Sequence, residues 1–151
     1  MSLGGGGGGQ MQQVAQQIEQ LEQTKEAIEA EIETLEEEKR DIDEAIDAID
    51  QLDSGSTVQV PIGGGAYVRA EVQDIDEVIV DLGADYSAER DQEGAKSSLE
   101  TKQEKLDDQI DDLRSEIAEV ETQVQELEQE AEQMQAQQMQ QLQQQQQQQD
   151  E

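Results

Sequence analysis

The most regular feature of the sequence is a spacing of residues by alternate steps of three and four, with apolar side chains at most of these positions. It runs unbroken from residue 11 to residue 49 and again from residue 99 to residue 138. A 3.5-residue repeat is typical of a coiled-coil seam, which is narrower than the apolar face of a globular helix. The seam positions are Met11, Val14, Ile18, Leu21, Lys25, Ile28, Ile32, Leu35, Lys39, Ile42, Ile46 and Ile49, then Leu99, Gln103, Leu106, Ile110, Leu113, Ile117, Val120, Val124, Leu127, Ala131, Met134 and Gln138.

The two repeats are matched in length, which predicts two helices paired antiparallel. In the simplest register Ile49 lies opposite Leu99, and facing layers continue to Val14 and Met134 at the other end. The periodicity alone also permits a register shifted by one heptad. That shift leaves unpaired apolar layers at one end, at a cost on the order of 1.5–3 kcal/mol per side chain.

Two lysines, Lys25 and Lys39, interrupt the first apolar seam. A lysine can lay its methylene stem along a seam while its ammonium group stays in water. Polar seam residues can also fix the register of a coiled coil.

Between the repeats, the period of apolar residues changes from helical to strand-like. The turn-forming stretch "DSGS" ends the first helix, and the glycines at 63–65 supply the positive φ of a hairpin connection. Pro61 cannot donate to a strand ladder, so its amide should face an edge or a bulge. The alternating apolar residues predict two consecutive hairpins: Val58, Val60 and Ile62 with Val68, Ala70 and Val72, then Val78, Val80 and Leu82 with Tyr86, Ala88 and Arg90.

Short hairpins such as these bury too little surface to be stable alone, and they expose strand edges. We therefore expect them to form an oligomer joint with copies or relatives of this chain. The predicted organisation is a flexible glycine-rich tail (1–10), a coiled-coil helix (11–53), two hairpins (54–91), a second coiled-coil helix (92–142) and a fraying glutamine-rich acidic tail (143–151). The predicted fold class is mainly α with a small β part.

The composition excludes a thick globular core and several kinds of chemistry. Apolar residues make up 32%, and Trp and Phe are absent. Without cysteine there is no disulfide, thiolate nucleophile or sulfur-ligated metal, and without histidine the commonest general base is missing. The glycines at 63–65 lack the spacing and the following helix of a nucleotide loop, and Asp74–Asp76 lacks the other ligands of an EF-hand. We expect no enzyme, no cofactor and no metal.

The formal net charge of −30 disfavours nucleic acid and anionic membranes as partners. Apolar runs are too short for a signal peptide or membrane span, which predicts a soluble cytoplasmic protein. The acids cover both helices and the hairpins. This distribution fits a plain acidic coiled coil, but it favours a protein of a salt-loving organism, since the screening length falls to roughly 3 Å in molar salt.

The segment from Val58 to Arg90, "VQVPIGGGAYVRAEVQDIDEVIVDLGADYSAER", resembles the alpha class of archaeal prefoldin subunits. The shared features are a first hairpin rich in proline and glycine, an aromatic-valine return at Tyr67, a valine-rich third strand ending at Gly83, and the aromatic Tyr86. Two hairpins, not one, also resemble the alpha class. The resemblance covers about residues 11 to 142 and excludes the glycine head and glutamine tail.

The resemblance implies an ATP-independent holdase without a cofactor. Two alpha subunits would pair through their hairpins into a barrel-like β platform, and four beta subunits would complete a hexamer with six coiled-coil tentacles. The tentacle tips would hold unfolded polypeptides and pass them to a group II chaperonin. Two alternatives are a structural or adaptor coiled coil that uses the hairpins as a dimerisation clip, and an enzyme, which the missing histidine and cysteine make very unlikely.

Glycine and glutamine tracts border the helix ends at the tip, so nothing caps the last apolar layers. Methionine is flexible and polarisable, which suits weak contacts with many apolar surfaces, and several tips would add their contacts by multivalency. The simpler explanation is that these residues contact only each other in the seam, and it is preferred for Val14 and Ile18. The candidate client contacts are Met11, Val14, Ile18, Met134, Met139 and Leu142.

Overall fold

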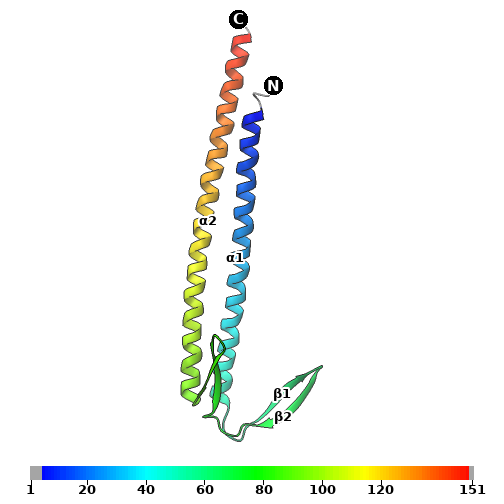
Figure 1. Ribbon diagram of the computed structural model, residues 1–151, viewed down its shortest axis with the longest axis vertical. Helices are drawn as coiled ribbons and strands as arrows, with labels where there is room; N and C mark the ends of the chain where they lie inside the picture. Colours follow the sequence, from blue (N-terminus) through cyan, green and yellow to red (C-terminus); the bar gives the residue numbers. More distant parts are fainter. Residues whose placement is uncertain (1–4, 150–151) are drawn as a thin grey trace. The chain divides into compact units, whose positions relative to one another are not determined.

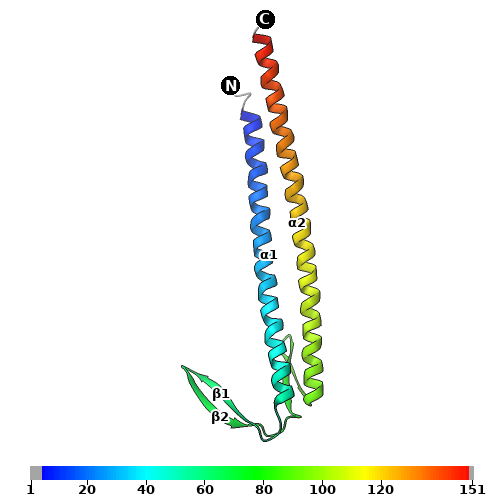
Figure 2. The same ribbon diagram turned by 180° about the vertical axis from the view of Figure 1, so that it is seen from behind.

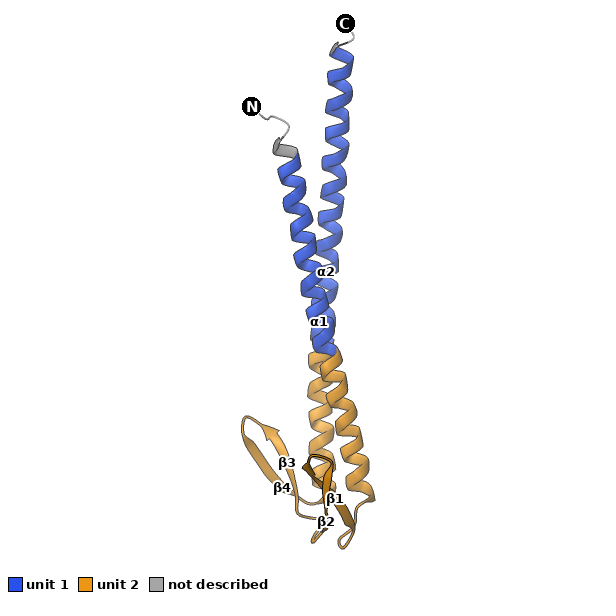
Figure 3. Cartoon of the chain, turned by 90° about the vertical axis from the view of Figure 1, so that its right-hand side faces the viewer, with its two compact units in different colours: residues 1–32, 111–151 blue, residues 33–110 orange. Residues whose placement is uncertain are grey.

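The computed structural model describes residues 5–149, which form two long helices and two hairpins. Their order is α1 (Gly5–Gln51), β1 (Thr57–Gly63), β2 (Ala66–Glu71), β3 (Val78–Gly83), β4 (Tyr86–Arg90) and α2 (Gln92–Gln149), as Figure 1 shows. The predicted fold class is confirmed. The chain divides into two compact units, coloured in Figure 3: unit 1 holds residues 1–32 and 111–151, and unit 2 holds residues 33–110.

The helices extend further than predicted at their outer ends. Helix α1 begins at Gly5, inside the segment expected to be a flexible tail, and α2 continues to Gln149 through the tail expected to fray. An established helix adds one hydrogen bond for each residue fixed, and glutamine is a tolerable helix former. Residues 1–4, 150 and 151, which also belong to the predicted tails, lie outside the described residues.

In unit 1 the α1 and α2 segments lie side by side along the predicted seam (Figures 1 and 2). Val14 is 6% exposed, and Ile28 and Val120 are also buried. Leu21 and Leu127 line the same groove, which is the pairing that the simplest antiparallel register predicts. A register shifted by one heptad would separate them, so the unshifted register is confirmed.

The core of unit 2 joins hairpin β3–β4 to the helix pair. Val80 packs with Ala95 and Leu99, and these three side chains are 4%, 0% and 9% exposed. Ala95 has only a methyl group, which lets the strand lie close to α2. Partly buried residues complete this cluster: Ile42, Ala45, Ile46, Ile49 and Val78.

Hairpin β1–β2 has the predicted pairing, with Val60 opposite Val68. The ladder is irregular between Pro61 and Gly63, so the proline lies at a bulge as expected. Strand β2 ends one residue earlier than predicted. Val72 instead joins the base of the hairpin, where its amide donates to the Ser56 carbonyl and its carbonyl accepts from Gly55, at 2.8 Å and 2.7 Å.

Hairpin β3–β4 is a separate two-stranded sheet with a bulge between Asp81 and Gly83. Its turn places two non-glycine residues, Ala84 and Asp85, in the left-handed region, with φ of 50° and 63°. Among the described strands no sheet has more than two members. The expected barrel platform would therefore have to come from several subunits.

The helix ends beside the hairpins are closed by side chains. Gln92 Nε2 donates to the carbonyls of Ile49 and Leu52, at 2.7 Å and 3.2 Å, and so satisfies two groups at the end of α1. Asp91 Oδ1 accepts from the Gly94 amide at 2.7 Å and caps the start of α2. These contacts fix where α1 ends relative to where α2 begins.

Candidate interaction surfaces

The exposed apolar side chains of unit 1 lie near its free helix end. Met139 is 65% exposed and Leu142 is 60% exposed. They are three residues apart on α2, so they lie on one helix face. We call this pair the tip pair.

The tip pair is exposed because the seam passes beside it. A small cavity of about 140 Å³ at this end is lined by Gln10, Met134, Gln137, Gln138 and Gln141. The seam therefore continues through Gln138 and Gln141, one position before each member of the tip pair. Near the start of α1, a Cβ added at Gly8 or Gly9 would meet nothing within 4 Å, so these positions give no side-chain contact across the seam.

The other predicted client contacts are in or near the seam. Val14 is buried, and Met11, Ile18 and Met134 are half-buried. For Val14 the seam explanation therefore accounts for the structure, because its side chain faces the partner helix. The six candidates separate into an exposed pair, a half-buried set of three and one buried residue.

Hairpin β1–β2 exposes an apolar face in unit 2. Val60, Ile62 and Val68 are 43%, 65% and 48% exposed. Alternation along the strands puts Val60 and Val68 on one face together with Val58 and Ala70, which are half-buried. Ile62 lies at the bulge next to this face. This face contains most of the predicted joint residues of the first hairpin.

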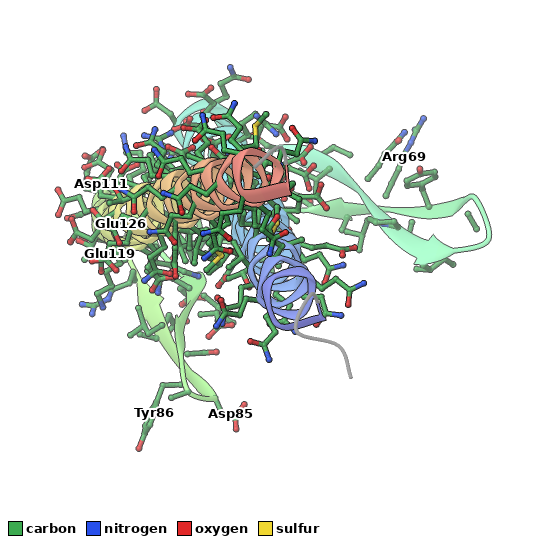
Figure 4. All side chains as sticks on the ribbon, turned by 90° about the horizontal axis from the view of Figure 1, so that it is seen from above. Arg69, Asp85, Tyr86, Asp111, Glu119 and Glu126 are labelled. Carbon is green, nitrogen blue, oxygen red and sulfur yellow. The ribbon has the colours of Figure 1, made fainter. Side chains whose placement is uncertain are left out.

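The second hairpin exposes only some of the residues predicted for the joint. Val80 is buried against the chain's own helices, and Val78 is half-buried against the same cluster. Leu82 is 43% exposed and remains accessible. The sequence reasoning missed Ile79 and Tyr86, each 73% exposed; Figure 4 shows Tyr86 pointing outward at the turn. The unbroken apolar run from residue 78 to residue 80 was the available signal, because it makes both strand faces apolar.

The seam lysines form ion pairs with the facing helix. Lys25 Nζ lies 3.0 Å from Glu121 Oε1 in unit 1, and the hydrogen bond and charge of Glu121 raise the pKa of Lys25. In unit 2 Lys39 forms an ion pair with Asp107 of the facing helix. Both lysines are about one-third exposed, which fits a stem along the seam and an ammonium group in water.

Carboxylates cover the outer helix faces. Asp111, Glu119 and Glu126, labelled in Figure 4, are exposed side chains of α2 in unit 1. Within residues 5–149, no group of three or more histidine, cysteine, aspartate or glutamate side chains could hold a metal ion. No helix in this part of the chain is long and apolar enough to cross a membrane.

A family model described as prefoldin subunit matches residues 21–137. The chain belongs to the prefoldin family. Prefoldins are non-enzymatic chaperones whose subunits assemble into hexamers with other prefoldin subunits. The match includes both hairpins and most of each helix.

The chain is similar to prefoldin alpha subunits of haloarchaea. It is 61% identical over 107 residues to that of Halobacterium salinarum, covering 71% of this chain and 70% of the relative. For Halorubrum lacusprofundi the identity is 60% over 103 residues, covering 68% of each. For Haloarcula marismortui it is 70% over 69 residues, 46% of this chain and 45% of that prefoldin. The predicted resemblance to alpha prefoldin of a salt-loving archaeon is confirmed.

A solved structure agrees with this assignment. Filamentous prefoldin from Methanocaldococcus jannaschii, solved by cryo-EM, has a TM-score of 0.52 and 30% sequence identity. The alignment covers 78% of this chain and 93% of that chain.

Proposed function

We propose that this prefoldin subunit is an ATP-independent holdase that captures unfolded polypeptides at the free helix ends of unit 1. The observation that carries the proposal is the exposed tip pair. These two apolar side chains are more than half exposed, and polar groups cover the rest of the helix around them. They therefore form a small apolar patch that an unfolded chain can bind. A single patch binds weakly, and several subunits acting together would hold one client by multivalency.

The proposal includes the assembly that presents these ends. The exposed apolar face of β1–β2, together with Ile79 and Tyr86, would be covered by other prefoldin subunits. We expect two copies of this chain and four beta subunits. The complex would work in the cytoplasm and pass its client to a group II chaperonin.

The direct test replaces the tip pair in the assembled complex with Met139→Gln and Leu142→Gln. Glutamine keeps the helix and matches the local sequence, so complex mass and helicity should not change. Suppression of aggregation of a denatured client, measured without ATP at high salt, should fall several-fold. The control places two glutamines at exposed mid-helix positions, Ala118→Gln and Thr122→Gln, and should retain full activity.

A truncation gives an independent check. Removing both helix ends outside Ile18 and Ala131 should preserve the hexamer and abolish aggregation suppression. Full activity in the truncated complex would refute the assignment of the site. A wild-type complex that ignores unfolded chains and binds one folded partner would instead support the adaptor function.

A further inference from the structure

The free end of unit 1 differs from the rest of that unit in carrying no charged side chain. Residues 5–18 of α1 contain none, and residues 133–149 of α2 contain none. The remainder of unit 1 is strongly acidic: residues 19–32 hold five glutamates and one lysine, and residues 111–132 hold nine acids and one arginine. We call the uncharged end the neutral tip. In the sequence two acids follow it, Asp150 and Glu151.

Both helices contribute to the neutral tip. Gln10 of α1 lines the same small cavity as Met134 and Gln141 of α2, so the two uncharged stretches lie together. The tip pair, Met139 and Leu142, lies within this region. Its apolar contacts are therefore surrounded by carboxamide groups and not by carboxylates.

Charge decides which polypeptides can approach each part of unit 1. The acidic surface repels a polypeptide of net negative charge and attracts one of net positive charge. The neutral tip does neither. Glutamine can donate and accept hydrogen bonds, so it can contact the peptide groups of an unfolded chain without selecting for its charge.

We infer that the neutral tip binds unfolded polypeptides whatever the sign of their net charge, so that acidic clients are bound as well as basic ones. This inference rests on the proposed holdase function and specifies its client. In high salt, repulsion acts only at close contact. An acidic client that touches the carboxylate-covered helices meets like charges, whereas at the uncharged end it meets none between residues 133 and 149. There Met139 and Leu142 supply apolar contact, and the glutamines supply hydrogen bonds.

The test compares two unfolded clients of similar length and opposite charge, thiol-capped α-lactalbumin (acidic) and thiol-capped hen lysozyme (basic). Binding to the assembled complex is measured in 1 M KCl, where screening leaves only close contacts effective. The wild-type complex should bind the two clients with affinities within about threefold of each other, because the contacts at the tip carry no charge.

Variants that add negative or positive charge to the tip test whether client binding occurs there. Glutamates or lysines are placed around the tip pair at the exposed positions Gln135, Gln143 and Gln146. The variant with three glutamates should bind the acidic client at least about threefold more weakly than the variant with three lysines does. For the basic client the order of the two affinities should reverse. A matched control adds three glutamates elsewhere on α2, at Gln109, Gln123 and Gln125, and should change neither affinity.

Several outcomes would overturn the inference while leaving the holdase function intact. These are a wild-type preference of tenfold or more for the basic client, equal effects of the tip variants on both clients, or an effect of the control as large as that of the tip glutamates. A wild-type complex that binds neither client would refute the proposed function itself. Circular dichroism and complex mass check that every variant is folded and assembled.

Discussion

At the residue scale, the structure shows how an acidic coiled coil uses its few cations. Lys25 and Lys39 interrupt the seam two heptads apart, and each reaches an acid of the facing helix. Because each contact needs one particular offset between the helices, the pairs favour the observed register. The sequence predicted this role for seam lysines, but it could not name Glu121 and Asp107 among so many acids.

Lys96 is a third lysine that pairs with acids, and its contacts predict a pH dependence of stability. Its Nζ lies 2.8 Å from Asp50 and 2.9 Å from Glu93, and it joins the last turns of α1 to the first turn of α2. The hydrogen bond to Asp50, followed by that to Glu93, raises the pKa of Lys96 well above its ordinary value of 10.5.

A raised lysine pKa stabilises the folded chain while the pH is below the unfolded value, and this contribution is lost as the pH rises through the folded pKa. Lys96→Met should therefore be less stable than the wild type at pH 7. The difference should persist to about pH 10 and shrink above it. Denaturant unfolding at high salt between pH 7 and 11.5 measures the difference. A gap that widens above pH 10 would contradict this assignment.

At the element scale, the two faces of β3 have different tasks. Val80 is 4% exposed and packs on Ala95 and Leu99, whereas its neighbour Ile79 is 73% exposed. One face attaches the hairpin to its own helices. The other is left for a neighbouring subunit in the proposed hexamer.

Two alanine substitutions should separate these tasks. Val80→Ala should lower the free energy of unfolding by about 1.5–3 kcal/mol, because it removes buried methyl groups and leaves a cavity. Ile79→Ala should leave the stability of the isolated chain nearly unchanged and weaken assembly with beta subunits. Chemical unfolding measures the first effect and mass photometry over a dilution series measures the second. Equal effects of the two substitutions on unfolding would contradict the assignment of faces.

The same strand shows where sequence reasoning stops. The seam and both hairpins followed from spacing and turn residues. The periodicity left two registers open, and the simplest one, which leaves no apolar layer unpaired, is the one observed. The packed face of β3 did not follow from spacing, because residues 78–80 are all apolar and alternation cannot choose between two apolar faces. The choice depends on the tight contact with Ala95, whose small side chain carries little signal in the sequence. At the tip, the position of Met139 and Leu142 beside the seam was readable, but their exposure also depends on α1 continuing as helix through its glycines.

At the scale of the whole molecule, net charge governs stability. The chain carries 39 acidic and 9 basic side chains. Their mutual repulsion is strong when the screening length is about 10 Å at 0.1 M salt and weak when it is about 3 Å at 1 M. Few buried contacts oppose that repulsion, since no side chain of the described core is larger than isoleucine or leucine.

Helicity should therefore fall as salt is removed. Circular dichroism at 222 nm, followed from 2 M to 0.1 M KCl, should show loss of helix at the low end. Undiminished helicity in dilute neutral buffer would contradict this prediction, because it would show that packing holds the helices together against the unscreened repulsion.

The Lys25–Glu121 ion pair and the Leu21–Leu127 layer lie in unit 1. The hydrogen bonds from Gln92 to the end of α1 lie in unit 2. The helix pair of unit 1 is thus a series of heptads, and each heptad of α1 faces one heptad of α2. Deleting one heptad from α1 and the facing heptad from α2 keeps all the remaining seam residues in register. The length of the helix pair can consequently be changed in steps of about 10 Å. A designed subunit could be shortened or lengthened in this way to suit a smaller or larger client.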